Sequence, residues 1–220
     1  FTADSVLPGP KTYQLPNSSK KLRNWTGKEC GPEGKVTLRQ ALAISCNTAF
    51  AWLGNELGAA AIRDQAEAFG FNSGFNIPLR AATSLFPQDP DAPQTALSAI
   101  GQFEVRATAL QMAMVAASIG NSGRTMNPYL VQEIRGPDLS ILQTTEPSQF
   151  EDALKPSNSL SLTEMLVNVV ENGTGSNAQI AGVRVAGKTG TAQTGNDSPS
   201  VAWFISFAPA AAPKVAVAVV

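Results

Sequence analysis

Apolar positions in the first part of the chain recur with the spacing of amphipathic helices. Thr37 stands directly before an apolar-periodic run at residues 38–57, which predicts two helices, the first of them capped by Thr37. The junction between them is expected at residues 45–47. Runs of the same kind predict further helices at residues 59–69, 108–119 and 162–170.

Short β-type runs replace this pattern towards the end of the chain, at residues 183–186, 202–207 and 215–220, and another is predicted at 129–134. Before residue 35, frequent Pro, Gly, Asn and Lys indicate loops and short strands, and four prolines indicate a long loop at 72–93. Because the helices precede the final strands without a strand-helix-strand repeat, we predict an α/β chain that ends in antiparallel strands.

Composition excludes several classes of function. The chain contains no histidine, which rules out a Ser-His-Asp triad and a histidine-ligated zinc site. Its 16 basic and 17 acidic residues give a net charge of −1 without a basic stripe, so no nucleic-acid partner is expected. With 43% apolar residues the chain can bury a core. No apolar run approaches the roughly 20 residues that span a bilayer.

Both ends of the sequence look cut. The chain starts without a methionine, and residues 214–220 stop inside an apolar β-type run that no turn residue closes. A final strand needs partners for its backbone groups. We therefore expect the sequence to be part of a longer protein.

The segment at residues 186–193, AGKTGTAQ, carries the sharpest chemical signal. In a strand, Lys188 and Gly190 face one side and Thr189 faces the other. The segment can thus offer an ammonium group, a hydroxyl group and an unobstructed backbone to a ligand that lies along its edge. A weaker candidate is the triplet Ser45-Cys46-Asn47, whose hydroxyl and amide can converge on one site.

A phosphate-binding loop is an alternative for the same region, because residues 182–189, GVRVAGKT, match the G-x-x-x-x-G-K-T pattern. Such a loop requires an apolar strand before its first glycine and a helix that opens at the lysine. The sequences NGTGSNAQIA before it and GTAQTGNDSPS after it meet neither requirement. Nucleotide binding through Gly182 to Thr189 therefore stays a distant alternative.

Two cysteines, Cys30 and Cys46, are too few for a zinc site or a disulfide scaffold. They can form one bridge, which would contribute about 3 kcal/mol for a loop of about 15 residues. They can equally be two buried thiols. Composition does not separate these two possibilities.

Three stretches carry a resemblance to a known family. The run ENGTGSNAQIAGVRVAGKTGTAQTG resembles the surroundings of the K-T-G box of penicillin-binding transpeptidases, and SCNTAF resembles their S-x-N box. Residues 101–131 resemble the helix and turn between these boxes in class B members. The chain is thus identified as part of a class B penicillin-binding protein transpeptidase domain, most similar to the penicillin-binding protein A type of actinobacteria.

The resemblance implies a fragment of the β-lactamase-like transpeptidase fold. Residues 37–134 would form its mainly helical part with the S-x-N box, and residues 159–220 would supply a helix and the antiparallel sheet with the K-T-G box. Ser45 would relay a proton while hydrogen-bonded to Lys188, and Asn47 would hold the donor peptide. The residues implied in binding the terminal carboxylate and the oxyanion are Thr189, Gly190 and Thr191.

The family further implies a D,D-transpeptidase that acts on the D-Ala-D-Ala stem peptides of peptidoglycan and binds β-lactams, without metal or cofactor. The parent protein would be anchored by an N-terminal membrane helix absent from this sequence. It would work at the extracytoplasmic face of the bacterial membrane with other cell-wall synthesis or division proteins. Thiols oxidise in that compartment, so Cys30 and Cys46 are expected to be bridged.

One departure from the family concerns the nucleophile, which belongs to an S-x-x-K box at the start of an apolar helix. Ser18 and Lys21 have this spacing, but the following LRNWTG has no apolar stripe, and a solvated lysine is a poor base. We therefore expect the nucleophile outside this sequence. The alternative is a non-catalytic family member that acts as a scaffold in a cell-wall complex.

Overall fold

The structure is a computed structural model that describes residues 1–193 and 199–220. Short antiparallel strand pairs form the N-terminal part, as the composition predicted: β1 pairs with β4, and β2 pairs with β3. The bounds of these elements are β1 Val6–Pro8, β2 Thr12–Gln14, β3 Lys21–Arg23, the 3-10 helix η1 Pro32–Gly34 and β4 Lys35–Thr37.

Apart from α4, the helices occupy the positions that the apolar periodicity predicted. Their bounds are α1 Leu38–Ala43, α2 Asn47–Leu57, α3 Ala59–Ala68, α4 Ala92–Ser98, α5 Ala109–Gly120 and α6 Pro156–Asn172, with a 3-10 helix η2 at Ser176–Ala178. Thr37 caps α1 as expected, because its side chain accepts a hydrogen bond from the Gln40 N–H. The prediction for α6 was too short, since Pro156 opens this helix at a first-turn position, where proline is favoured.

Helix α4 was missed by the sequence reasoning, which ended the long loop at residue 93. Asp91 and Gln94 form a reciprocal capping box, in which each side chain accepts a hydrogen bond from the backbone N–H of the other residue. An acidic residue followed three positions later by glutamine is a recognisable helix-start signal. This local signal would have placed the start of α4.

The C-terminal strands β9 Ala186–Ala192, β10 Val201–Ala208 and β11 Val215–Val219 form an antiparallel sheet in the order β11-β10-β9. The strand predicted at residues 183–186 was misplaced, because β9 begins only at Ala186 and Val183 makes an isolated bridge with Ile180. Residues 188–190 therefore lie inside a strand. Within the described residues, β9 pairs only with β10, so it forms one edge of the sheet.

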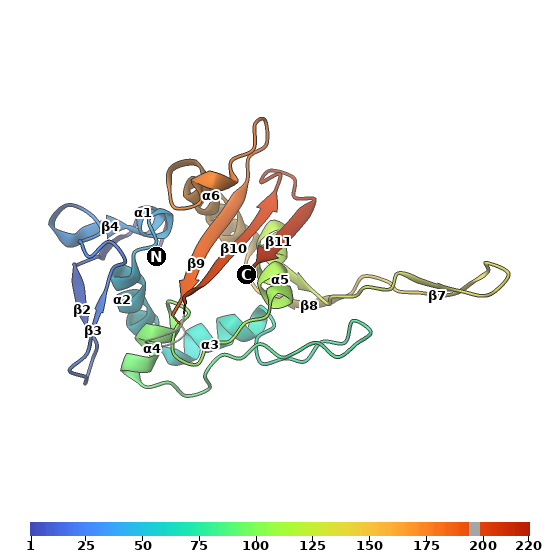
Figure 1. Cartoon of the computed structure of the whole chain (residues 1–220), viewed down its shortest axis with the longest axis horizontal. Helices are drawn as coiled ribbons and strands as arrows, with labels where there is room; N and C mark the ends of the chain where they lie inside the picture. Colours follow the sequence, from blue (N-terminus) through green and yellow to red (C-terminus); the bar gives the residue numbers. More distant parts are fainter. Residues whose placement is uncertain (194–198) are drawn as a thin grey trace.

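Two helices cover this sheet. Figure 1 shows α6 beside β9 and α5 beside β11, in agreement with the contacts between these elements. Val167 of α6 and Phe207 of β10 are almost fully buried in the core that they share with Ala186. Burying a side chain of the size of phenylalanine contributes roughly 1.5–3 kcal/mol. This packing sets the position of β9.

A long hairpin projects away from the helices and the sheet (Figure 1). It contains β6 Glu133–Arg135 and β7 Ile141–Thr144, and it emerges from the pair β5 Arg124–Met126 and β8 Gln149–Asp152. The strand predicted at residues 129–134 was wrong over most of its length. The apolar side chains there are largely exposed, so burial does not select the strand position.

Cys30 and Cys46 form a disulfide, with a Cα–Cα distance of 6.0 Å. The expected bridge is therefore confirmed. It ties the loop after β3 to the residue directly before α2, beside a second core that contains Leu7, Val36 and Ala49.

We predict that replacing both cysteines, Cys30→Ala with Cys46→Ala, lowers the free energy of unfolding by about 3 kcal/mol, because the bridge closes a loop in the unfolded chain. Chemical denaturation of both proteins measures this loss. Dithiothreitol should destabilise the wild type by a similar amount and leave the double variant unchanged. A wild type that is insensitive to reductant after both thiols have become titratable would contradict the prediction.

Candidate active site

A hydrogen bond joins two of the motifs that the sequence singled out. The Lys188 ammonium donates to the Ser45 hydroxyl over 3.1 Å, although the two residues are 143 positions apart. The expected meeting of Ser45 and Lys188 is thus confirmed in geometry. The helices on one side and the sheet edge on the other bring them together.

Ser45 lies in the junction between α1 and α2, as the apolar pattern predicted. Its φ of 56° is in the left-handed region, where a non-glycine residue costs of order 1–3 kcal/mol. This turn ends α1 and allows α2 to begin at Asn47. Strained residues of this kind are concentrated at functional sites.

Lys188 is partly buried, and its Nζ also donates to the Thr189 carbonyl over 2.8 Å. Burial lowers the pKa of Lys188 from its ordinary 10.5 to about 8, because the charged form loses hydration. At neutral pH, Lys188 is therefore unprotonated in roughly a tenth of the molecules. The Ser45 hydroxyl accepts from the ammonium, so its own proton is free for another acceptor.

A groove of about 680 Å³ runs along the edge of β9 beside these residues. Asn47 lines it, and the Asn47 amide donates to the Arg23 carbonyl over 3.2 Å. The groove thus gathers the predicted residues Ser45, Asn47, Thr189, Gly190 and Thr191. The Lys188 side chain reaches the same site through its bond to Ser45.

Gly190 avoids a tight contact with the neighbouring strand. It pairs with Trp203 across β9 and β10, and a Cβ at Gly190 would lie only 3.2 Å from the Trp203 Cβ. Because Gly190 has no side chain, the backbone of this strand edge is uncovered. Thr191, the next residue, has an exposed side chain.

Thr174 is a groove residue that the sequence reasoning missed. Its hydroxyl lies 2.6 Å from that of Thr189, and its backbone N–H donates to the Ala43 carbonyl over 3.0 Å. A Cβ at the preceding Gly173 would lie 2.3 Å from the same carbonyl oxygen. If Thr174 donates to Thr189, the Thr189 proton is free to bond a ligand. The glycines on either side of Thr174 were the available signal.

Ser18 and Lys21 have the S-x-x-K spacing but do not line one site together. Ser18 lies in the turn between β2 and β3, where its hydroxyl accepts from the Lys20 N–H over 3.1 Å. Lys21 lines the groove, whereas Ser18 does not. Strand β3 begins at Lys21 and a loop follows it, where the family pattern requires an apolar helix.

The phosphate-loop alternative for residues 182–189 also lacks its geometry. Lys188 is the third residue of strand β9, whereas a phosphate loop opens a helix at this lysine. The described part of the chain holds no group of three or more His, Cys, Asp or Glu side chains able to bind a metal ion. Among these residues, no helix has the length and apolar character needed to cross a membrane.

Comparisons with known proteins agree on one family. The family model described as penicillin binding protein transpeptidase domain matches residues 1–220. Peptidoglycan D,D-transpeptidase PbpA of Mycolicibacterium smegmatis is 45% identical in an alignment 218 residues long, which covers 97% of this chain and 44% of that protein. For PbpA of Mycobacterium tuberculosis the identity is 44% in an alignment 222 residues long with gaps, which covers 99% of this chain and 45% of that protein.

The fold matches as well as the sequence. A solved structure of penicillin-binding protein A from M. tuberculosis, an acyl-enzyme complex with ceftriaxone, superposes with a TM-score of 0.95 at 44% identity. The match covers 99% of this chain and 50% of that one. The expected fold class is thus confirmed. The chain spans less than half the length of the curated relatives that it matches.

The lowered pKa of Lys188 predicts a pH-dependent stability. Between about pH 8 and about pH 10.5, Lys188 binds more protons in the unfolded chain than in the folded chain. The contribution of Lys188 to the free energy of unfolding therefore rises with pH through that window. Relative to Lys188→Met, the wild-type free energy of unfolding should gain up to about 3 kcal/mol. Urea titrations across the window test this difference. Parallel curves for the two proteins would disprove it.

Proposed function

Because the chain belongs to the family of penicillin-binding protein transpeptidase domains, we propose that the protein containing it is a peptidoglycan D,D-transpeptidase. The substrate would be a stem peptide that ends in D-Ala-D-Ala. The observation that carries this proposal is the hydrogen bond between Lys188 and Ser45 across the groove. The names of the related proteins support the same reaction.

Ser45 would act as the proton relay of the acylation step. In that step the nucleophilic serine oxygen bonds to the carbonyl carbon of the penultimate D-Ala, and the bond from this carbon to the last D-Ala nitrogen breaks. The departing nitrogen must gain a proton. The Ser45 hydroxyl accepts from the Lys188 ammonium, so its own proton can go to this nitrogen and be replaced by the one that leaves the nucleophile.

Strand β9 would hold the substrate along its free edge. Thr189 and Thr191 would bind the terminal carboxylate with their hydroxyls, and the Thr191 backbone N–H would donate to the oxyanion. The loss of one such donor costs roughly 3 kcal/mol of transition-state stabilisation in other enzymes. Asn47 would hold the peptide backbone on the opposite wall, with Gly190 leaving the strand backbone accessible.

We place the nucleophilic serine outside residues 1–220. Ser18 and Lys21 have the sole S-x-x-K spacing in this sequence, and Ser18 does not line the groove. An activated hydroxyl needs a base within hydrogen-bond reach. The chain would then supply the relay, the oxyanion donor and the carboxylate site, and the longer protein would supply the nucleophile with its base.

β-Lactams would acylate the same serine. Structures of penicillin-binding protein A from M. tuberculosis are acyl-enzyme complexes with ceftriaxone, imipenem and penicillin G. We further propose that the protein works at the extracytoplasmic face of the bacterial membrane, held there by a membrane helix of the longer protein, with other cell-wall synthesis or division proteins as partners. The disulfide fits this oxidising location.

Benzylpenicillin should label the longer protein and leave the 220-residue chain unlabelled, because the chain retains the relay without an activated nucleophile. Intact-mass spectrometry detects the adduct, and peptide mapping locates it. An adduct on the 220-residue chain at Ser18 or Ser45 would disprove this assignment. A full-length protein that contains an S-x-x-K serine yet stays unlabelled would favour the non-catalytic scaffold.

In the full-length protein, Ser45→Ala should slow acylation by benzylpenicillin about 10²-fold or more, the usual range for losing a positioned proton-transfer group. Stopped-flow measurement of adduct formation gives the rate. Ser18→Ala is the matched control, because this serine lies in the turn between β2 and β3. The Ser18→Ala variant should be acylated at the wild-type rate. Equal rates for Ser45→Ala and Ser18→Ala would remove Ser45 from the mechanism.

A further inference from the structure

Helix α2 begins without a cap of its own. Its N-cap residue is Cys46, which makes no side-chain capping bond, and its sulfur belongs to the disulfide with Cys30. The first N–H groups of a helix need acceptors from elsewhere. This requirement matters because Asn47 is the first residue of α2 and Ser45 directly precedes Cys46.

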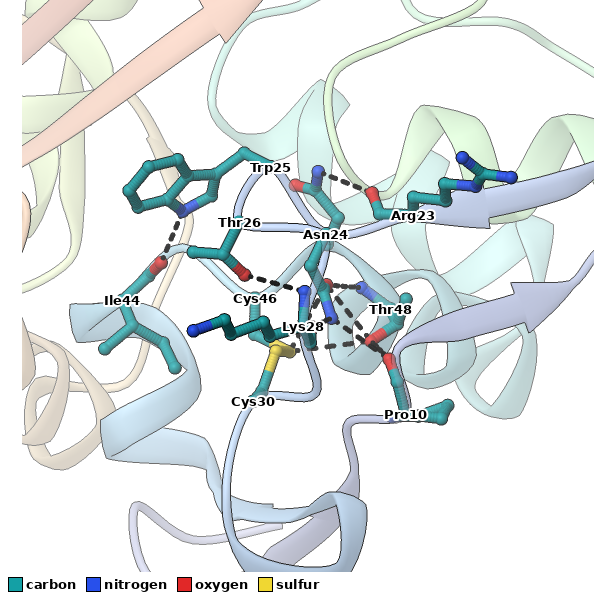
Figure 2. Close-up of a disulfide and its surroundings, with 11 residues drawn as sticks. Pro10, Arg23, Asn24, Trp25, Thr26, Lys28, Cys30, Ile44, Cys46 and Thr48 are labelled. Atoms are coloured by element: carbon teal, nitrogen blue, oxygen red, sulfur yellow. Dashed lines mark hydrogen bonds between the residues drawn. A yellow bond between two sulfur atoms is a disulfide. The ribbon is translucent and has the colours of Figure 1, made fainter.

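Asn24 supplies the missing acceptor from a distant part of the chain. Its Oδ1 accepts from the Thr48 N–H over 3.0 Å and from the Thr48 hydroxyl over 3.1 Å. Thr48 is the second residue of α2, a position that N-cap side chains commonly bond. Figure 2 shows the Asn24 side chain directed at the start of this helix, beside the disulfide.

The Asn24 amide has one orientation that satisfies its surroundings. Its Nδ2 donates to the Pro10 carbonyl over 3.0 Å and to the Lys28 carbonyl over 2.8 Å. The Thr48 hydroxyl has one proton, which it shares between the Asn24 Oδ1 and the same Pro10 carbonyl, 2.8 Å away. Asn24 is only 4% exposed, so each of these bonds replaces a lost bond to water. These partners fix the orientation of the Asn24 amide.

The residues on either side of Asn24 hold the neighbouring parts of the same turn. The Trp25 indole N–H donates to the Ile44 carbonyl, and the Arg23 carbonyl accepts from the Asn47 amide, both over 3.2 Å. Residues 23–25 thus contact the chain before Ser45 and after it (Figure 2). Ser45 itself, with its left-handed backbone, lies between these points.

We propose that Asn24 is a positioning residue, which caps α2 from outside the helix and thereby sets Ser45 against Lys188 and Asn47 against the groove. The proposal rests on the proposed function, because it assigns a catalytic consequence to this cap. The Ser45–Lys188 bond is 3.1 Å long. A displacement of the turn by about 1 Å would break it, and misplacements of that size cost about 10²-fold in rate.

The test uses the full-length protein with Asn24→Leu, which keeps the size of the side chain and removes its hydrogen bonds. The rate of acylation by benzylpenicillin should fall about 10- to 100-fold. Hydrogen exchange at the start of α2 should accelerate, whereas amides of α5 should keep their protection. Should Asn24→Leu fail to fold, Asn24→Ala provides the same two readouts without an added apolar group.

Two controls separate positioning from general destabilisation. Thr48→Val removes the threonine hydroxyl but retains the N–H that Asn24 caps, so exchange at this amide and acylation should stay close to wild type. Met114→Ala opens a cavity in buried α5, outside the groove, and should lower Tm without slowing acylation. Asn24 variants that acylate as fast as Met114→Ala would overturn the proposal.

Failure of the two proposals can be told apart. If the wild-type full-length protein forms no adduct, the proposed function fails, while exchange at Thr48 still reports whether Asn24 caps α2. If the wild type is labelled and the Asn24 variants lose Thr48 protection without losing rate, the cap is structural and the positioning role is refuted.

Discussion

The hydrogen bond between the Lys188 ammonium and the Ser45 hydroxyl joins the edge of the C-terminal sheet to the junction of α1 and α2. Each partner is held by a separate core. Lys188 belongs to β9, which α6 packs against, and Ser45 lies beside the core that unites the N-terminal strands with α1 and α2. A bond of 3.1 Å tolerates little relative movement. The geometry of the groove therefore depends on how firmly these two parts of the chain are packed.

Charged side chains on the surface form exposed ion pairs, whereas the ammonium at the groove is partly buried. Arg184, which lies just before β9, forms ion pairs with Glu164 and Glu171 that connect this segment to α6. These side chains are about half exposed, and pairs of this kind contribute about 0–1 kcal/mol each. Burial lowers the pKa of Lys188, and no carboxylate in residues 1–193 or 199–220 contributes to this shift. This partly buried ammonium donates to the Ser45 hydroxyl and the Thr189 carbonyl, and its burial costs folding free energy.

The turn around Ser45 shows how the fold offsets such costs. The left-handed residue and the desolvated lysine both disfavour folding. Opposing them are a covalent bridge at Cys46 and the buried Asn24 amide, which fulfils its hydrogen bonds with three separate backbone segments. Both restraints act close to Ser45 in the chain, the bridge at Cys46 and the Asn24 cap at Thr48. Covalent and hydrogen-bonding restraints thus meet beside the residue whose geometry the groove depends on.

Local patterns in the sequence were sufficient for α1, α2, α3 and α5, because helical periodicity and a capping threonine are properties of neighbouring residues. The boxes at Ser45 and Lys188 were recognisable by family resemblance. Contacts between distant residues could not be recognised in the sequence. The Thr174–Thr189 hydroxyl pair and the Asn24 cap join positions that share no periodicity. The lowered pKa of Lys188 likewise depends on the chain segments that bury it. Sequence determined the elements and the chemical groups, and tertiary packing decided their distances and hydration, since both arise only when remote segments meet.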